Sequence, residues 1–430
     1  MQRILVENVK NNIGKEVLLK GWIHQIRPLG KIAFILLRDR TGIIQTIVTD
    51  LKRINVTELE RESAIEILGK VKQEKQAPDG IEVEVAKINV ISRTHAPIPF
   101  EVNRTQDMLN LKIDMILDHR PFSLRNPELG SVFKVQAEIC RSFAEFMRRN
   151  GFLEVHTSKI IAQGTEGGTA LFPIQYFEQK AYLAQSPQFY KQMLVGAGYE
   201  RVFEIGFVYR AEDHATSRHI NEYLSLDFEM GFIESYQDVI NLEIEFLRFL
   251  FENLKKNCSR ELSIHKVTLP EIKEIPQIPL LEAMKIVNKE SSRTDDLDPE
   301  AEKLICEYAT KKYGSEFVYI INYPATARPF YTMPDLENPG LTKSFDLLYK
   351  GLEVTTGSQR IHDYQMLVDN IKKFKMNPAA FDFYLEIFRF GMPPHGGLAI
   401  GTERLTQQIL NLKNVREACL FPRDRYRLTP

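Results

Sequence analysis

One stretch, residues 207–229, narrows the possible folds of this chain more than any other. An apolar run at 202–208 leads into it and predicts a buried strand. At 223–229 apolar and polar residues nearly alternate, which is typical of a strand with one buried face. Because the two runs flank a polar segment, the simplest prediction is an antiparallel hairpin with a long loop.

Charged residues stand at the end of the first strand and in the loop of this predicted hairpin. Arg210 and Glu212 follow the first strand, and Arg218 and His219 lie in the loop. Arginine stays charged and its guanidinium bonds two oxygens at once, so two arginines that face each other across a loop can bind a polyphosphate. A surface hairpin with solvated charges is the alternative interpretation of these residues.

A second segment, residues 396–405, reads GGLAIGTERL and predicts a glycine-rich apolar strand that turns into a helix. Gly401 lets the backbone come close to a ligand, and Arg404 falls in the first helical turn. The two segments, FxYRAE and GxxxGTERL, lie about 190 residues apart. Together they resemble motifs 2 and 3 of the class II aminoacyl-tRNA synthetases, and the resemblance extends over nearly the whole chain.

The composition limits the classes of protein that remain open. The chain has 430 residues, 43% hydrophobic and 26% charged, enough for two or three globular domains. Its formal net charge of -1 predicts no strong overall field, so a nucleic-acid surface would be a local patch. The four cysteines form no CxxC pair, which argues against a zinc site or a disulfide framework and fits the cytoplasm. We expect no signal peptide and no membrane span.

Residues 1–100 predict a small all-β domain. Turn signals separate five β-rich runs, and a stretch at 51–63 with helical composition falls between the third and the fourth. This is the element order of an OB-fold barrel. The five runs are 17–26, 32–38, 43–48, 64–71 and 81–91.

OB-folds bind single-stranded nucleic acid by stacking bases on aromatic side chains within a basic groove. Arg27, Lys31, Phe34 and Gln45 suit that role. The alternative is that Phe34 belongs to the core and Gln45 is a plain exposed polar residue.

The rest of the chain divides into a linker or hinge at 101–130 and a catalytic domain at 131–430, with a peripheral insertion at about 255–315 in which we find no chemistry. Apolar spacing predicts an amphipathic helix at 132–149, followed by a strand at 152–157. This pair resembles class II motif 1, which implies a homodimer. The family places a proline at the end of that strand, where this chain has Ser158. The chain therefore departs from the family pattern at this point of the expected interface.

The resemblance implies an α+β fold, with an N-terminal OB-fold barrel and a class II catalytic domain built on an antiparallel sheet flanked by helices. Several stretches look specifically like aspartyl-tRNA synthetases of the archaeal and eukaryotic type: QSPQ at 185–188, GSQR at 357–360 and the tail at 421–430. This implies a ligase that uses ATP and Mg²⁺ to attach L-aspartate to tRNA through aspartyl-adenylate.

The family motifs carry roles onto particular residues. Arg210, Glu353 and Arg404 would be catalytic. Mg²⁺ would bind Glu353 and Thr356, where the family usually has serine in place of Thr356. Aspartate would be surrounded by Glu166, Gln188, Lys191, Arg210, Thr356 and Arg360, with the cations Lys191 and Arg360 paired with its side-chain carboxylate. ATP would be held by Arg210, Glu212, Arg218, His219, Ile220, Glu353, Gly401, Thr402, Glu403 and Arg404.

Two residues of the expected barrel lead to a more specific hypothesis about the choice of tRNA. His24 and Pro78, both expected on loops, resemble the non-discriminating enzymes that charge tRNA-Asp and tRNA-Asn alike. The anticodon would be read by His24, Arg27, Phe34, Gln45 and Pro78. Such an enzyme needs an amidotransferase downstream, to convert Asp-tRNA-Asn into Asn-tRNA-Asn.

Four alternatives stay open. The enzyme could be strict for tRNA-Asp, or it could be an asparaginyl-tRNA synthetase, although that reading predicts loss of the cationic side-chain pocket. A paralogue that makes a free amide or modifies tRNA would not need the OB domain as an anticodon reader. A non-catalytic single-strand-binding protein would not need Arg210, Glu353 and Arg404 together. No P-loop, HIGH or KMSKS motif occurs in the chain.

Overall fold

The computed structural model of the protein describes residues 1–103, 111–165, 170–213, 216–288 and 295–429. The chain forms two compact units, Met1–Asp107 and Met108–Pro430. No helix among the described residues is long and apolar enough to cross a membrane.

The first unit is a closed barrel with strand order β1-β2-β3-β5-β4, which confirms the predicted OB-fold topology. Alternation along each strand directs Ala33, Ile35 and Leu37 of β2 into the core and leaves Phe34 on the outer face. The elements are η1 (Val6–Asn12), β1 (Glu16–Leu29), β2 (Ile32–Arg38), β3 (Ile43–Val48), η2 (Val56–Glu58), β4 (Ala64–Gln73), η3 (Pro78–Gly80) and β5 (Ile81–Ser92).

The helix expected at 51–63 is wrong, because only the short 3₁₀ turn η2 forms there. The run Ile54-Asn55-Val56-Thr57 consists of β-branched residues and asparagine, which are poor helix formers. The Asn55 side chain accepts a hydrogen bond from the Thr57 amide, so it caps a single turn.

The second unit is built on one large sheet of order β12-β13-β14-β15-β16-β11-β10-β6. Its central strands are antiparallel, whereas β12 and β6 at the two edges pair in parallel, so the sheet is mixed. A separate small sheet has the order β7-β9-β8. The strands are β6 (Leu153–Glu154), β7 (Ile160–Ile161), β8 (Pro173–Tyr176), β9 (Gln179–Leu183), β10 (Arg201–Tyr209), β11 (Glu222–Gly231), β12 (Gln277–Pro279), β13 (Phe317–Ile321), β14 (Ser344–Tyr349), β15 (Leu352–Gln359) and β16 (His395–Gly401).

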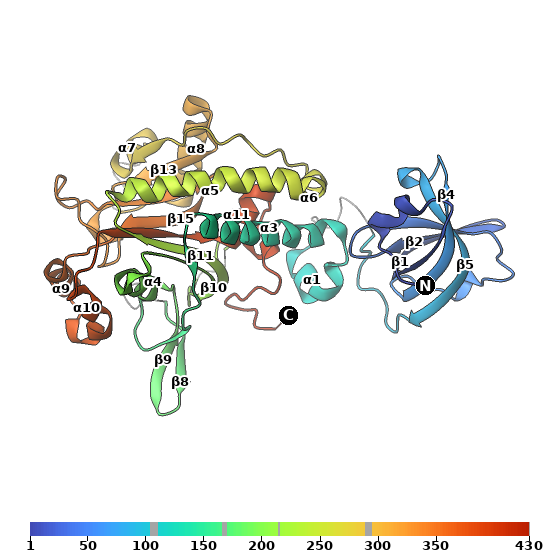
Figure 1. Ribbon diagram of the computed structural model, residues 1–430, viewed down its shortest axis with the longest axis horizontal. Coiled ribbons are helices and arrows are strands. Elements are labelled where there is room, and N and C mark those ends of the chain that lie inside the picture. The colour runs from blue at the N-terminus through green and yellow to red at the C-terminus, as the bar shows by residue number, and fades with distance from the viewer. Residues whose placement is uncertain (104–110, 166–169, 214–215, 289–294, 430) are drawn as a thin grey trace. The chain divides into compact units, whose positions relative to one another are not determined.

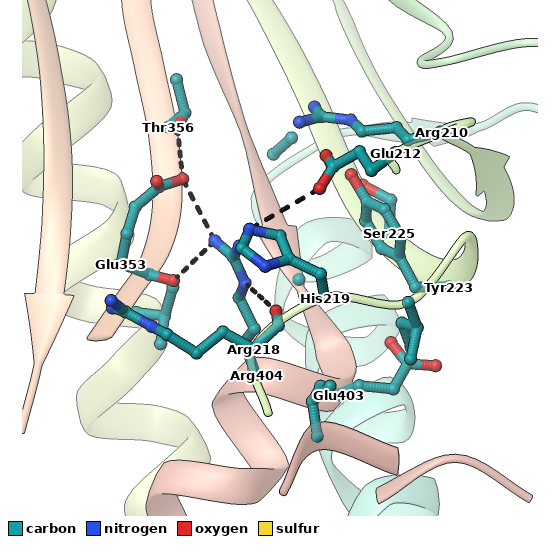
Figure 2. A pocket seen from close by; sticks show the side chains of 15 residues that line it. Arg210, Glu212, Arg218, His219, Tyr223, Ser225, Glu353, Thr356, Glu403 and Arg404 are labelled. Carbon is teal, nitrogen blue, oxygen red and sulfur yellow. Dashed lines mark hydrogen bonds and ion pairs between the residues drawn. The ribbon is translucent and has the colours of Figure 1, made fainter. Parts of the chain in front are cut away.

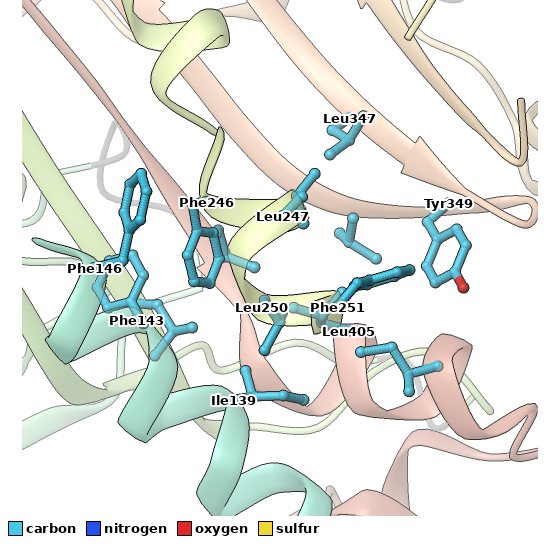
Figure 3. Close-up of a cluster of buried hydrophobic side chains, with 14 of the residues drawn as sticks. Ile139, Phe143, Phe146, Phe246, Leu247, Leu250, Phe251, Leu347, Tyr349 and Leu405 are labelled. Carbon is cyan, nitrogen blue, oxygen red and sulfur yellow. The ribbon is translucent and has the colours of Figure 1, made fainter. Parts of the chain in front are cut away.

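Long helices cover one face of this sheet, where α3 and α5 run side by side (Figure 1). Their apolar stripes meet those of α11 and the sheet in the main core, in which phenylalanines of α3 and α5 pack edge to face (Figure 3). The helices are α1 (Ile113–Asp118), α2 (Arg120–Ser123), α3 (Pro127–Arg149), α4 (Gln188–Leu194), α5 (Tyr236–Asn257), α6 (Ser259–Ile264), α7 (Leu280–Ile286), α8 (Pro299–Tyr313), α9 (Tyr364–Lys373), α10 (Asp382–Phe388), α11 (Thr402–Leu410) and the 3₁₀ turn η8 (Val415–Ala418).

The predicted hairpin is confirmed as β10 and β11, and the glycine-rich segment forms β16 followed by α11. The helix expected at 132–149 is α3, which begins earlier because Asn126 caps it. One expectation needs correction, because the strand expected at 152–157 is only β6. The segment at 255–315 contributes the edge strand β12 to the sheet and packs α8 against β13.

Candidate active site

Strands β11, β15 and β16 lie side by side and direct one set of side chains to the face opposite the long helices. In β11, Leu226 and Phe228 enter the core, while Tyr223, Ser225 and Asp227 point to the other face and line pockets. The near-alternation seen in the sequence therefore decides which β11 residues reach the site.

A β-bulge brings Glu353 and Thr356 of β15 to the same face. In a regular strand, residues three apart point to opposite faces. Here the register shifts opposite Leu347 and Leu348, so Val354 is an extra residue in the strand. The Thr356 hydroxyl donates to Glu353 Oε1 at 2.9 Å (Figure 2).

Arg404 reaches this carboxylate from the first turn of α11. Its Nη1 donates to the Glu353 carbonyl at 3.2 Å and lies 3.6 Å from Glu353 Oε1, and its Nε donates to the Arg218 carbonyl at 3.4 Å (Figure 2). Burial works to raise the pKa of Glu353, but the Arg404 charge and the Thr356 hydrogen bond outweigh it and hold the pKa below its usual value. Glu353 is therefore ionised at neutral pH.

The end of β10 and the loop after it close the other side of the pocket. The Arg210 guanidinium lies over the Tyr223 ring, 5.8 Å from its centroid, and His219 Nε2 lies 3.6 Å from Glu212 Oε2 (Figure 2). Most of the residues predicted to hold ATP gather around this pocket. Those that line the pocket are Arg210, Glu212, Arg218, His219, Ile220, Glu353, Gly401, Glu403 and Arg404.

Thr402 and Glu403, which precede Arg404 in α11, differ from it in their contacts. Thr402 is fully buried and is not part of the pocket lining. Glu403 lines the pocket, but both of its carboxylate oxygens accept the Leu224 amide, at 3.2 and 3.1 Å. Burial raises the pKa of Glu403 to about 8. Its side chain thus ties α11 to β11.

A second pocket of about 450 Å³ adjoins the first and shares Arg210, Glu353 and Thr356 with it. Gln188 and Lys191, from one face of α4, line it together with Arg360 at the end of β15. Three of the residues predicted to surround aspartate thus line the same pocket. All three side chains are nearly fully buried.

Lys191 and Arg360, two of the cations that line this pocket, already have carboxylate partners from β11. Lys191 Nζ donates to Asp227 Oδ1 at 2.8 Å, and Arg360 Nε donates to Glu229 Oε1 at 2.9 Å. Burial alone would raise the pKa of Glu229, but Arg360 and Lys191 lower it, so the carboxylate is charged. Two internal anions therefore offset the charges of Lys191 and Arg360.

A carboxylate beside Glu353 was not predicted from the sequence. Asp346 of β14 lines the second pocket and forms a buried ion pair with Arg328, at 2.6 Å. Burial raises the pKa of Asp346; Arg328 opposes this rise and the Glu353 carboxylate adds to it. Arg328 also stacks on Tyr323, with its guanidinium 3.7 Å from the ring centroid. The signal was present in the alternating run SFDLLY, whose only charge is Asp346.

Glu302 of α8 was missed as well, since no chemistry was expected in its segment. Its carboxylate forms an ion pair with Arg218, whose Nη2 also donates to the Gly351 carbonyl at 3.3 Å. Burial raises the pKa of Glu302 to about 7, against the effect of Arg218. No local pattern marks this residue, because the contact spans 84 positions.

The donor set fits a magnesium ion that is completed by a substrate. Among the described residues there is no group of three or more histidine, cysteine or acidic side chains that could hold a metal alone. Mg²⁺ is usually held by one or two carboxylates plus substrate phosphates, however, and it prefers oxygen ligands. Glu353, Thr356 and Asp346 present oxygens, and the two carboxylates sit close enough for each to affect the other.

On the barrel, strand pairing brings three of the residues predicted to bind nucleic acid, Arg27, Phe34 and Gln45, to one outer face. Arg27 of β1 lies opposite Phe34 of β2, and Phe34 is half-buried. Gln45 of β3 donates to Glu82 at 3.0 Å. The interpretation of Phe34 as a core residue is wrong, because its neighbours Ala33 and Ile35 fill the core instead.

His24 and Pro78 differ from each other in setting. Pro78 is exposed and begins η3, a turn in the loop between β4 and β5. His24 was expected on a loop, but it lies in β1 at a register shift and is buried. Arg38 Nη1 donates to its Nδ1 at 2.8 Å and also pairs with Glu62. Burial, together with Arg38, lowers the pKa of His24 to about 4, so the ring is neutral. Glu166, predicted to contact aspartate, lies outside the described residues.

Comparisons with known proteins agree with this geometry. Residues 112–425 match the model of the class II tRNA synthetases (D, K and N), and residues 17–91 match the OB-fold nucleic acid binding domain. The aspartate–tRNA(Asp/Asn) ligase of Deinococcus radiodurans is 45% identical, with 100% of this chain and 99% of the relative covered. The aspartate–tRNA(Asp) ligase of Pyrococcus abyssi is 42% identical, with 97% of each covered.

Solved structures extend the likeness. Asparaginyl-tRNA synthetase from Pyrococcus horikoshii, complexed with asparaginyl-adenylate, matches with a TM-score of 0.93 at 28% identity, covering 100% of both chains. Aspartyl-tRNA synthetase from Entamoeba histolytica matches with a TM-score of 0.90 at 29% identity, covering 100% of this chain and 93% of the other. The chain therefore belongs to the class II tRNA synthetases of the D, K and N group and carries an N-terminal OB-fold domain.

Proposed function

We propose that this protein attaches L-aspartate to tRNA in two steps, through aspartyl-adenylate formed from aspartate and ATP. The observation that carries the proposal is the wall of Arg210, Glu353 and Thr356 shared by two adjoining pockets. One pocket adds Arg218 and Arg404, which suit phosphates, and the other adds buried hydrogen-bond donors. A carboxylate in the second pocket would meet an α-phosphate in the first at this wall.

The first step is attack of the aspartate α-carboxylate on the α-phosphate of ATP. Two anions must be aligned and the charge of the transition state neutralised, so most of the rate comes from positioning and electrostatics. Arg210 and Arg404 would bind phosphate oxygens from opposite sides. Mg²⁺, held by Glu353 and Thr356 with Asp346 beside them, would neutralise phosphate charge when bound.

The second pocket would bind the aspartate side chain through donors that cannot accept. Lys191 and Arg360 offer only N–H groups, which match a carboxylate better than the NH₂ of an asparagine amide. Asp227 and Glu229 keep the two donors in place through their ion pairs. A site built on such hydrogen bonds rejects a ligand that leaves buried groups unpaired. The pair Lys191 and Arg360 thus favours aspartate over asparagine.

We further propose that both tRNA-Asp and tRNA-Asn are substrates. The outer face of the barrel would bind the anticodon through Arg27, Phe34 and Gln45, and His24 and Pro78 would set the relaxed choice. The relative from D. radiodurans is named for both tRNAs, which supports this proposal. Relaxed charging requires an amidotransferase to convert the Asp-tRNA-Asn product.

A homodimer would form along α3 and the edge of the sheet. The apolar side chains of Leu153 on β6 and Phe207 on β10 are about half exposed, at 47% and 48%. An edge strand such as β6 is open to pairing, and a second copy would cover both β6 and the exposed ring of Phe207 on the neighbouring strand β10. Gel filtration at micromolar concentration would test this.

Two alternatives remain for the experiment to decide. The relative from P. abyssi is named for tRNA(Asp) alone, and a close structural neighbour is an asparaginyl-tRNA synthetase. The test is charging of separate tRNA-Asp and tRNA-Asn transcripts with labelled aspartate, with labelled asparagine as the control. Aspartate on both transcripts supports the proposal. Aspartate on tRNA-Asp alone removes the relaxed choice, and charging by asparagine would overturn the substrate pocket.

A further inference from the structure

The C-terminal segment 415–427, here called the strap, runs beside the loop that carries Arg210 and Glu212. We propose that the strap positions these two residues for catalysis, with Arg425 as its main positioning residue. This inference rests on the proposed function, because it assigns Arg210 a role at the ATP phosphates. Between the described residues of the loop and the strap there are three separate contacts, and helices α1 and α2 anchor the strap at its other side.

The first contact is a backbone joint at Asn221. Its amide donates to the Arg423 carbonyl of the strap at 2.8 Å. Its side-chain Nδ2 donates to the carbonyls of Arg210 at 2.7 Å and Glu212 at 3.2 Å. The Arg210 amide in turn donates to the Asn221 carbonyl at 2.9 Å. One strap carbonyl therefore fixes a residue that holds the backbone of both Arg210 and Glu212.

Two further contacts hold the loop on either side of this joint. Arg425 Nη1 donates to the Asp213 carbonyl at 3.0 Å and lies 3.5 Å from the Asp213 carboxylate. At the other end, the Val415 amide donates to the Ser217 carbonyl at 2.9 Å. The strap thus binds the loop at residues 213, 217 and 221.

The strap is itself held firmly to α1 and α2. The Arg120 side chain of α2 is buried and donates to the strap carbonyls of Glu417, Cys419 and Leu420, at 3.1, 2.7 and 2.9 Å. Burial lowers the pKa of Arg120 only to about 10, so the guanidinium is charged at neutral pH. Arg427 Nη2 donates to Asp118 of α1 at 2.5 Å.

Arg425 lines a neighbouring pocket together with Glu212 and Asp213 of the loop. Arg425 does not line the pocket that contains Arg404, so it acts on ATP through the loop rather than by touching phosphate. A small displacement of a group that binds the reacting phosphate slows the reaction strongly, because alignment supplies much of the rate. Loss of Arg425 would leave Asp213 and its neighbours without one of their three attachments.

The test compares Arg425→Ala with Arg425→Lys and with the control Tyr426→Ala. Tyr426 is the adjacent strap residue and its side chain is 81% exposed. Aspartate-dependent ATP–pyrophosphate exchange, without tRNA, gives kcat and KM for each. We expect Arg425→Ala to lower kcat about tenfold. Arg425→Lys should recover part of the rate, since an ammonium can still donate to a carbonyl, and Tyr426→Ala should match the wild type.

Thermal unfolding and calorimetric titration with ATP complete the design. Equal kcat for Arg425→Ala and wild type would overturn the inference. A loss that follows a lowered Tm, and that disappears when rates are normalised to folded protein, would also overturn it. If the wild type shows no aspartate-dependent exchange, the proposed function fails instead. The strap is then judged by ATP binding, for which we expect a Kd about fivefold higher in Arg425→Ala.

Discussion

The buried ion pair of Lys191 and Asp227 offers a quantitative test of how the aspartate pocket is balanced. Lys191→Met keeps the length of the side chain but removes the charge that lies 2.8 Å from Asp227, whose side chain is 2% exposed. Removing one partner of a buried pair costs about 3–5 kcal/mol. Ser225 still donates to Asp227 at 2.6 Å, so we expect the lower end, about 3 kcal/mol.

The double variant Lys191→Met/Asp227→Asn removes both charges and leaves neither one unpaired. We expect it to be more stable than the sum of the single variants by at least about 2 kcal/mol. Urea unfolding at pH 7 of the wild type, both single variants and the double variant gives this coupling free energy. The double variant should still lack aspartate-dependent exchange, because the Lys191 donor is gone.

Additive losses would refute this reasoning. If the double variant loses as much free energy of unfolding as the two single variants combined, Asp227 does not balance Lys191. Recovery of exchange activity in the double variant would contradict the assignment of Lys191 to the substrate. The double variant is expected to regain stability but not exchange activity, so the unfolding and the activity measurements test separate parts of this reasoning.

Three further predictions concern other contacts. Glu243 of α5 is fully buried and accepts hydrogen bonds from Tyr319 and Thr355. Burial raises its pKa to about 7, above its unfolded value of 4.5, so its contribution to stability falls as pH rises through 4.5–7. Glu243→Gln should therefore raise Tm relative to the wild type more at pH 8 than at pH 5. Thr356→Val removes a hydrogen bond that lowers the pKa of Glu353, so the acid limb of the pH profile for exchange should move to higher pH, whereas Thr356→Ser should leave it in place. Arg27→Ala and Phe34→Ala should each raise KM for tRNA about tenfold, with exchange unchanged. Phe34 would stack on a base, which is worth about 1–3 kcal/mol, and Arg27 would contribute positive charge to the groove.

The local architecture of the site could be predicted from the sequence. Alternation at 223–229 marked β11, and the GGLAIGTERL segment marked β16 and α11. Both patterns depend on neighbours a few residues apart, because strand and helix periods are short. The FxYRAE and GxxxGTERL motifs resembled those of the family, and this resemblance implied a common site for Arg210, Glu353 and Arg404, which line one pocket.

The balance of charge in the site was decided by tertiary structure alone. Lys191 meets Asp227, Arg360 meets Glu229 and Arg218 meets Glu302 across 36, 131 and 84 positions. A residue pattern carries no record of such partners, since they depend on which strands and helices come side by side. The bulge that sets Glu353 beside Thr356, and the burial of His24 against Arg38, are of the same kind. The sequence alone therefore determined the family and the types of functional side chain in the site. The packed fold decided which charges a substrate would meet, because ion pairs in a buried site form between elements that are distant in the chain.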